Sequence, residues 1–164
     1  MGLEDLINSM PFAELLGVEV MEVADGHARA RLPVGDDLRS SSEGEVVHGG
    51  ATYALADTAG GAAVVSLSRD VSPTVDMRID YLAPVTDDIY ATADVIRYGS
   101  NLSMVQVQIH DEDNTRVATA QGTYKTGGQG DGTPWDSSEH REAGDSPSRD
   151  RDDTGRDDTD EAKR

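Results

Sequence analysis

One segment of 20 residues, from Gly49 to Ser68, constrains the fold of this chain more than any other part of it. It consists mostly of small residues, and Asp57 is its only charged side chain. A carboxylate near the centre of a bilayer costs roughly 3 kcal/mol, so we do not interpret the segment as a membrane span. At 1.5 Å per residue, it predicts a buried helix about 30 Å long.

The residues that precede this segment predict three further features. Nonpolar residues at helical spacing predict a short helix over 3–10, which Pro11 ends. The pattern then changes, and residues 17–32 are expected to form a hairpin with its turn at Asp25–Gly26. Residues 35–47 are polar and rich in Ser and Gly, which is typical of a loop.

The residues that follow the segment predict an antiparallel sheet. After Pro73, nonpolar side chains occupy every second position, as in a half-buried strand: Val75, Met77, Ile79 and Tyr81. Three more strands are expected near 88–98, 101–110 and 115–125, and together the four would form a meander. One nonpolar helix and one antiparallel sheet predict an α+β fold in which a curved sheet wraps around a long central helix.

The composition changes sharply near residue 126. All 31 Leu, Ile, Val and Phe residues lie in residues 1–126, whereas residues 127–164 hold 12 acidic and 6 basic groups. A segment without such side chains cannot bury enough nonpolar surface to fold. We therefore expect one folded domain over 1–126 and an acidic, disordered C-terminal tail over 127–164.

The net charge of −18 excludes some partners and suggests an environment. It would repel the phosphate backbone, so we expect no nucleic-acid partner. The excess of acid is not confined to the tail, since residues 1–126 hold 20 acidic and 8 basic groups, and only 2 of the 14 basic residues are lysines. Because concentrated salt screens such repulsion, we interpret the chain as a halophilic protein.

Two further absences in the sequence set expectations. With no Cys and no cluster of His, Asp and Glu at metal-ligand spacing, we expect no metal site and no redox cofactor. Glu4 and Asp5 stand where the positive region of a signal peptide would be. We therefore expect a cytoplasmic protein that does not associate with membranes.

Asp57 is the first candidate catalytic residue. A carboxylate in a nonpolar helix is costly unless it is paired, hydrogen-bonded or faces a site. A desolvated Asp could serve as a base or as a nucleophile. The alternative is that the helix has one solvated edge and that Asp57 lies on it.

The His48-Gly49-Gly50 run at the start of the helix is the second candidate. Glycines there leave backbone N–H groups open to a ligand, and the positive end of the helix dipole favours the developing negative charge of an oxyanion. Asp57 follows His48 by nine residues, roughly 13 Å along a helix. If both act in catalysis, a second subunit must bring them together.

Two stretches resemble a known family. Residues 48–59 (HGGATYALADTA) and residues 73–84 (PTVDMRIDYLAP) resemble the hotdog-fold acyl-CoA thioesterases of the phenylacetate-degradation type. The likeness covers about residues 10–126 in motif, order and spacing. It implies a homodimer or a dimer of dimers, with active sites at the subunit interface, that hydrolyses an acyl-CoA to a free acid and coenzyme A.

The resemblance also implies roles for individual residues. Asp57 would be the base or nucleophile, and the Gly49 N–H of the other subunit would hold the oxyanion. His48 would position the carbonyl or the leaving group. Thr74 stands where family members often carry a Ser that orients the attacking water.

Three further residues are candidates for substrate binding. Ser42 lies six residues before His48, where family members commonly carry an Asn, and a serine has a shorter reach and one donor instead of two. Gly50 adjoins the expected oxyanion site. Arg78 is a candidate partner for the phosphates of coenzyme A, which would enter only as part of the substrate.

Two other functions are compatible with the same fold. A non-catalytic hotdog module would bind an acyl-CoA without turning it over, although such a module gains nothing from the carboxylate of Asp57. A hotdog dehydratase would act on hydroxyacyl thioesters. Dehydratase sites usually pair a His with a carboxylate, whereas the spacing of His48 and Asp57 is that of the thioesterases.

Overall fold

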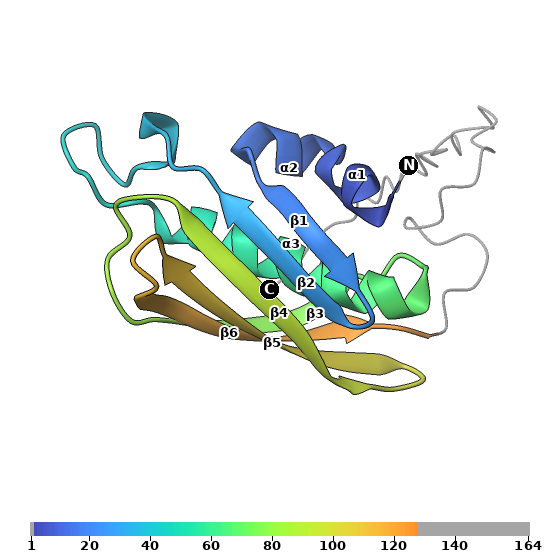
Figure 1. Ribbon diagram of the computed structural model, residues 1–164. Coiled ribbons are helices and arrows are strands. Elements are labelled where there is room, and N and C mark those ends of the chain that lie inside the picture. Colours follow the sequence, from blue (N-terminus) through green and yellow to red (C-terminus); the bar gives the residue numbers. More distant parts are fainter. Residues whose placement is uncertain (1, 128–164) are drawn as a thin grey trace, which may run out of the picture.

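The computed structural model describes residues 2–127, and most of the predicted tail therefore lies outside the described residues. Figure 1 shows one curved sheet with a long helix against it. The helices are α1 (Leu3–Asn8), α2 (Pro11–Leu16) and α3 (Gly49–Ser68), with a 3-10 turn, η1 (Asp36–Leu38). The strands are β1 (Glu19–Ala24), β2 (His27–Leu32), β3 (Thr74–Tyr81), β4 (Ile89–Tyr98), β5 (Leu102–Asp111) and β6 (Arg116–Lys125).

The six strands form one antiparallel sheet in the order β1-β2-β4-β5-β6-β3. The predicted meander is right for β4, β5 and β6 but wrong for β3, which pairs with β6 rather than with β4. The β1–β2 hairpin explains this difference, because β2 pairs with one edge of β4 and β5 pairs with the other edge. No edge of β4 is left for β3. The free edge of β6 is therefore the place left for β3.

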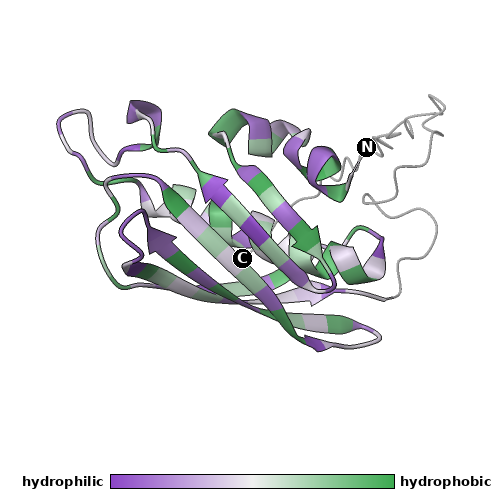
Figure 2. Ribbon diagram, viewed as in Figure 1, coloured by the Kyte–Doolittle hydropathy of each residue, from purple (hydrophilic) through white to green (hydrophobic). Residues whose placement is uncertain are grey.

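Helix α3 lies across the sheet and contacts all six strands. Its predicted bounds and its burial are confirmed, since 11 of its 20 residues are buried. The small side chains of the helix allow this close approach, and Leu55, Ala59 and Ala63 are fully buried. Figure 2 shows the matching pattern on the strands, where hydrophobic and hydrophilic residues alternate in bands.

A second short helix, α2, was not predicted. The expected helix over 3–10 ends at Asn8 as α1, and Pro11 begins α2. Pro11 was interpreted only as a stop signal, yet proline suits the first position of a helix, where its missing N–H costs nothing. Gly17, with φ at +73°, then ends α2 in the left-handed conformation. Helix α1 packs against β1. Among residues 2–127, the helices include none with the length and hydrophobicity of a membrane span.

A β-bulge at the start of β3 changes which side chains face the helix. Thr74 pairs with Tyr124 and Asp76 with Thr123, so Val75 is an extra residue in the ladder. Of the side chains predicted to face the core, Met77 is buried, so that prediction is right. Val75 is 59% exposed, so the prediction is wrong for this residue. Tyr81, at the far end of the strand, is exposed as well.

Candidate active site

His48 caps the N-terminus of α3. Its Nδ1 accepts a hydrogen bond from the Gly50 N–H at 2.9 Å, so Nδ1 carries no proton in this arrangement. The proton of the neutral ring is then on Nε2, which makes no hydrogen bond to a described residue. The cap occupies the Gly50 amide, so Gly50 does not offer that amide to a ligand.

The Gly49 amide is the donor that remains at the start of α3. Its N–H has no hydrogen-bond partner among residues 2–127, while its C=O accepts a hydrogen bond from the Tyr81 hydroxyl at 2.8 Å. A Cβ at Gly49 would lie 3.1 Å from the Tyr81 ring, so any side chain here would require the ring to shift slightly. Although most of the Tyr81 side chain is exposed, some desolvation raises its pKa, as does the nearby Tyr53, so the hydroxyl is a donor at neutral pH.

A groove opens beside the Gly49 amide. It encloses about 420 Å³, and mainly nonpolar side chains line it. They come from the loop before α3 (Val46 and Val47) and from the segment after β3 (residues 82–85), with Tyr81 between them. A nonpolar groove that ends at an unpartnered backbone donor is suited to a ligand with an apolar chain and a polar carbonyl.

Asp57 lies on the part of α3 that the sheet covers least. It is half-buried, as are Tyr53 and Gly61, one turn before and after it. The single chain thus places Asp57 at an open edge of the helix, which was the alternative to a desolvated carboxylate. Even so, the side chain is held in place, because the Thr74 hydroxyl donates to its Oδ1 at 2.7 Å.

Tyr124 provides a second hydroxyl on Asp57, which the sequence analysis missed. The Tyr124 OH lies 3.2 Å from Asp57 Oδ1 and 3.1 Å from its backbone oxygen. Burial raises the pKa of Tyr124 far above its ordinary value, and the charge of Asp57 raises it further, so the phenol stays a donor. A signal was available: Tyr124 ends an alternating inward run of small residues, Ala118, Ala120 and Gly122.

The structure separates the predicted site residues into groups. Thr74 and Asp57 are brought together, whereas Gly49 lies eight residues before Asp57 in the same straight element, about 12 Å away. Ser42 is exposed on the turn before Val47 and makes no hydrogen bond to a described residue. Arg78 is 77% exposed and pairs with Asp80 at 2.9 Å on the outer face of β3. The single chain therefore does not join Ser42 or Arg78 to Asp57.

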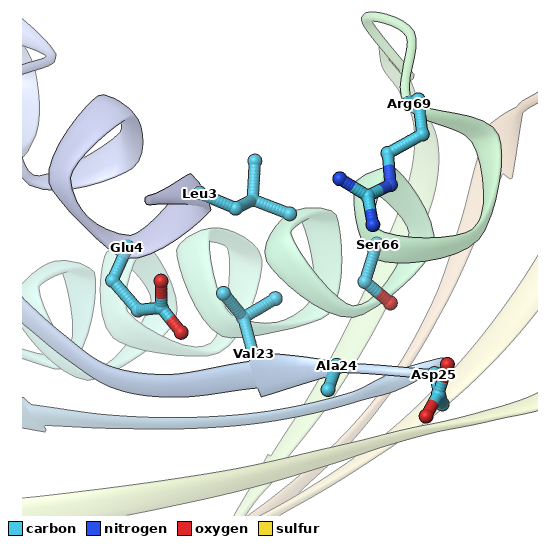
Figure 3. Close-up of a pocket in the computed structure, with 7 residues that line it drawn as sticks. All are labelled: Leu3, Glu4, Val23, Ala24, Asp25, Ser66 and Arg69. Carbon is cyan, nitrogen blue, oxygen red and sulfur yellow. The ribbon is translucent and has the colours of Figure 1, made fainter. Parts of the chain in front are cut away.

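Two further observations concern metal binding and a second cavity. No group of three His, Cys, Asp or Glu residues within the described chain is arranged to hold a metal ion. A second cavity, of about 200 Å³, lies at the other end of α3 (Figure 3), where Glu4, Asp25 and Arg69 line it. Ser66 in that cavity already bonds to Gly26 and Ala63, and the cavity is remote from Gly49.

Known proteins are similar to the part of the chain that forms this fold and site. The family model of the thioesterase superfamily matches residues 44–118, from the loop before α3 into β6. A putative esterase from Halobacterium salinarum is 33% identical over 134 residues, which cover 75% of this chain and 89% of that protein.

The chain belongs to the thioesterase superfamily. A second relative, the medium/long-chain acyl-CoA thioesterase YigI of Salmonella typhimurium, is 26% identical over 140 residues, 76% of this chain and 90% of that protein. A solved structure, a variant of the phenylacetic acid degradation protein PaaI from Thermus thermophilus, is 29% identical with a TM-score of 0.64. That match covers 71% of this chain and 98% of the other.

Membership of the thioesterase superfamily confirms three predictions made from the sequence. The resemblance to the hotdog thioesterases is confirmed, and so is the α+β fold with a curved sheet around one helix. The prediction of an enzyme that hydrolyses thioesters is confirmed as well. A thioesterase needs a group that directs water or attacks the carbonyl carbon, and a donor for the oxyanion. Helix α3 carries a carboxylate at Asp57 and, at Gly49, an amide without a partner among residues 2–127.

Proposed function

We propose that this thioesterase hydrolyses acyl-CoA thioesters to a free acid and coenzyme A. The observation that carries the proposal is the unpartnered Gly49 N–H, which stands at the positive end of α3 where the nonpolar groove opens. The acyl chain would lie along the groove, with its carbonyl oxygen at this amide. The relatives named as acyl-CoA thioesterases support this substrate class.

Asp57 has two chemical routes to the same products. As a general base, it takes a proton from water while the water oxygen bonds to the carbonyl carbon, and the C–S bond breaks as the oxyanion collapses. As a nucleophile, it displaces the thiolate to form a mixed anhydride, which water then hydrolyses. In both routes the Gly49 N–H stabilises the oxyanion, and the thiolate takes up a proton.

The residues around these two groups have supporting roles in the proposal. Thr74, hydrogen-bonded to Asp57 Oδ1, holds the carboxylate and orients the attacking water. His48 is left with a proton on Nε2, which is suited to donate to the carbonyl oxygen or to the leaving sulfur. No metal or separate cofactor takes part, and coenzyme A enters with the substrate.

The site is proposed to form between two subunits. One carbonyl cannot contact both Gly49 and Asp57 of the same helix, because about 12 Å separates them. Strand β3 is an edge of the sheet with the exposed Val75 on it, and the half-buried Asp57 lies on the open side of α3 nearby. Such an edge is open to a second copy of the chain. We therefore propose a homodimer with two sites, or a dimer of two such dimers.

The proposed environment is a cytoplasm with concentrated salt. The 20 acidic and 8 basic groups of residues 1–126 repel one another in dilute buffer, and salt shortens the range of that repulsion. The relative from Halobacterium salinarum is in line with this proposal. Salt would also reduce the repulsion between the acidic surface and the phosphates of coenzyme A.

The test is the release of free thiol from aryl, short-chain and long-chain acyl-CoAs in molar KCl. Asp57→Asn should lower kcat by about 100-fold or more on every accepted substrate, because asparagine can neither take the proton nor attack. The matched control is Asp113→Asn, an exposed residue of the turn between β5 and β6.

Three outcomes would contradict the proposal. Equal turnover by wild type and a folded Asp57→Asn variant would remove Asp57 from the chemistry. No thiol release by wild type from any of the substrates, with binding retained, would favour the non-catalytic module. An enoyl product without free thiol would favour the dehydratase.

A further inference from the structure

We propose that Tyr124 is a positioning residue for Asp57, which keeps the carboxylate turned so that Oδ1 is held and Oδ2 is the oxygen that reacts. The inference rests on the proposed function, because it assigns a task to a side chain that supports Asp57. Tyr124 itself is 1% exposed and lies too deep to touch a substrate.

The hydrogen bonds around Asp57 distinguish its two carboxylate oxygens. Oδ1 is within reach of two hydroxyls, at 2.7 Å from Thr74 and at 3.2 Å from Tyr124. Oδ2 has no hydrogen-bond partner among residues 2–127. The Tyr124 hydroxyl has one proton, which it shares between Oδ1 and the Asp57 backbone oxygen at 3.1 Å. Together with the Thr74 donor, this contact restricts the rotation of the carboxylate about its Cβ–Cγ bond, so Oδ2 has a defined direction.

Two glycines, one on α3 and one on β6, leave the space that the Tyr124 ring occupies. A Cβ on Gly60 of α3 would lie 2.4 Å from the Tyr124 oxygen, and a Cβ on Gly122 of β6 would lie 2.8 Å from its Cε2. Any side chain at either position would displace the ring. The chain thus leaves room at two positions for a phenol whose hydroxyl reaches α3 at Asp57.

The bulge in β3 brings the second hydroxyl to the same oxygen. Thr74 pairs directly with Tyr124 in the β3–β6 ladder, and the extra residue Val75 gives Thr74 its inward direction. Without the bulge, the alternation of β3 would turn a valine toward Asp57 instead. Two neighbouring strands therefore present facing hydroxyls to a single carboxylate oxygen.

The two hydroxyls are the polar side chains that contact the Asp57 carboxylate among the described residues. The titratable groups near Asp57 are Tyr124 of β6 and Tyr53 of its own helix. Thr74, which contacts it from β3, does not titrate. Asp57 forms no ion pair with a cation among the described residues. Hydrogen bonds to a carboxylate favour its ionised form, so the loss of either hydroxyl is expected to disfavour that form.

The test compares Tyr124→Phe with wild type in the thiol-release assay over a range of pH. The variant keeps the ring but lacks the donor, so kcat should fall roughly 10-fold with KM unchanged, which is the effect of losing one hydrogen bond to a charged group. The acidic limb of the kcat profile should move to higher pH. The control is Tyr98→Phe, whose hydroxyl makes no hydrogen bond within the described chain and which should behave as wild type.

A merely structural role would lower the melting temperature of Tyr124→Phe and leave its kcat and pH profile unchanged, and that result would overturn the inference. If Tyr124→Phe does not fold, 3-fluorotyrosine at position 124 keeps the ring and strengthens the donor. The acidic limb should then move to lower pH, and an unmoved limb would overturn the inference. Asp57→Asn in the same assay separates the two proposals: if Asp57→Asn is inactive and Tyr124→Phe is normal, only the role of Tyr124 fails.

Discussion

Single residues at the start of α3 combine a structural task with a chemical one, and His48 is the clearest case. Its ring caps the helix through Nδ1 and leaves Nε2–H without a hydrogen-bond partner among residues 2–127. An asparagine is also a good N-cap but lacks the imidazole. The two tasks of His48 can therefore be separated by substitution.

We expect His48→Ala to lower the free energy of unfolding by about 0.5–2 kcal/mol, because the Gly50 N–H loses its acceptor. His48→Asn should stay close to wild type in stability and should still lose kcat, because it lacks the Nε2–H donor. Denaturant unfolding and the thiol-release assay measure the two effects. A His48→Asn variant with normal kcat would limit His48 to the cap.

Tyr124 and Thr74 show how a residue gains importance through a partner far away in the chain. Neither is unusual in its own segment, and their meaning comes from Asp57, which both contact. Thr74 was predicted because of a family resemblance, whereas no motif pointed to Tyr124. The sheet joins the three through pairing between β3 and β6.

At the scale of elements, the packing of α3 on β6 depends on which glycine faces Tyr124. A Cβ on Gly60 would meet the Tyr124 oxygen at 2.4 Å, whereas a Cβ on Gly61 would lie 3.6 Å from the ring, an ordinary contact. The two glycines are adjacent in one helix, so they form a matched pair of test positions.

Gly60→Ala should lower the free energy of unfolding by about 1–3 kcal/mol, because the added methyl group overpacks the interface. Gly61→Ala should raise it by up to about 1 kcal/mol, because alanine favours the helix. Thermal or denaturant unfolding measures both. Equal effects of the two substitutions would mean that Tyr124 does not pack tightly against α3.

A second link between elements involves Asp88, just before β4. It accepts a hydrogen bond from the Val34 N–H at 2.8 Å and pairs with Arg31 of β2 at 2.5 Å. Partial burial opposes its ionisation, but the Val34 N–H and the Arg31 guanidinium outweigh this effect, so the pKa of Asp88 is lowered. A lowered pKa in the folded state means that the ionised form stabilises the fold.

The contribution of Asp88 should therefore be complete above the pKa of an unfolded Asp, about 4, and should be lost as the pH falls through its lower folded value. Asp88→Asn should lower the melting temperature at neutral pH, and its difference from wild type should shrink below about pH 4. Melting curves over pH check this. A difference that stays constant into acid would show that ionisation of Asp88 does not stabilise the fold.

At the scale of the whole molecule, the proposed site needs two copies of the chain. Asp57 of one subunit would work with Gly49 of the other, so two different inactive variants could complement each other. A heterodimer of Asp57→Asn and Gly49→Val subunits would contain one site in which both groups are intact.

Co-expression of these two variants should restore roughly a quarter of the wild-type activity, since half of randomly mixed dimers are heterodimers with one intact site of two. Each variant expressed alone should be inactive. The valine at Gly49 would meet Tyr81, so a melting curve must show that this variant folds. Absence of any recovery in purified heterodimers would place both groups of the site within one subunit.

The acidic surface is also a property of the whole molecule. Because residues 1–126 carry 20 acidic and 8 basic groups, their mutual repulsion destabilises the compact state in dilute buffer. The melting temperature should rise with KCl and level off near 1 M, where the screening length is about 3 Å. A melting temperature that does not depend on KCl would contradict the proposed salt adaptation.

The sequence by itself determined the central helix and the groups that lie along it. The bounds of α3 followed from a single nonpolar run, because helix formation depends on neighbours within a few residues. Asp57 stood out as the one charge in that run, and Gly49 stood out by its place at the helix start. The thioesterase family followed from two short stretches of sequence.

Only the tertiary structure decided how the strands pair and what surrounds Asp57. Strand β3 lies beside β6 because β2 and β5 occupy both edges of β4, which no local pattern records. The bulge at Val75 reversed the expected faces of the first residues of β3, since a single extra residue shifts an alternation of period two. Tyr124 became part of the site in the same way, because its position depends on contacts between residues 67 apart in the chain.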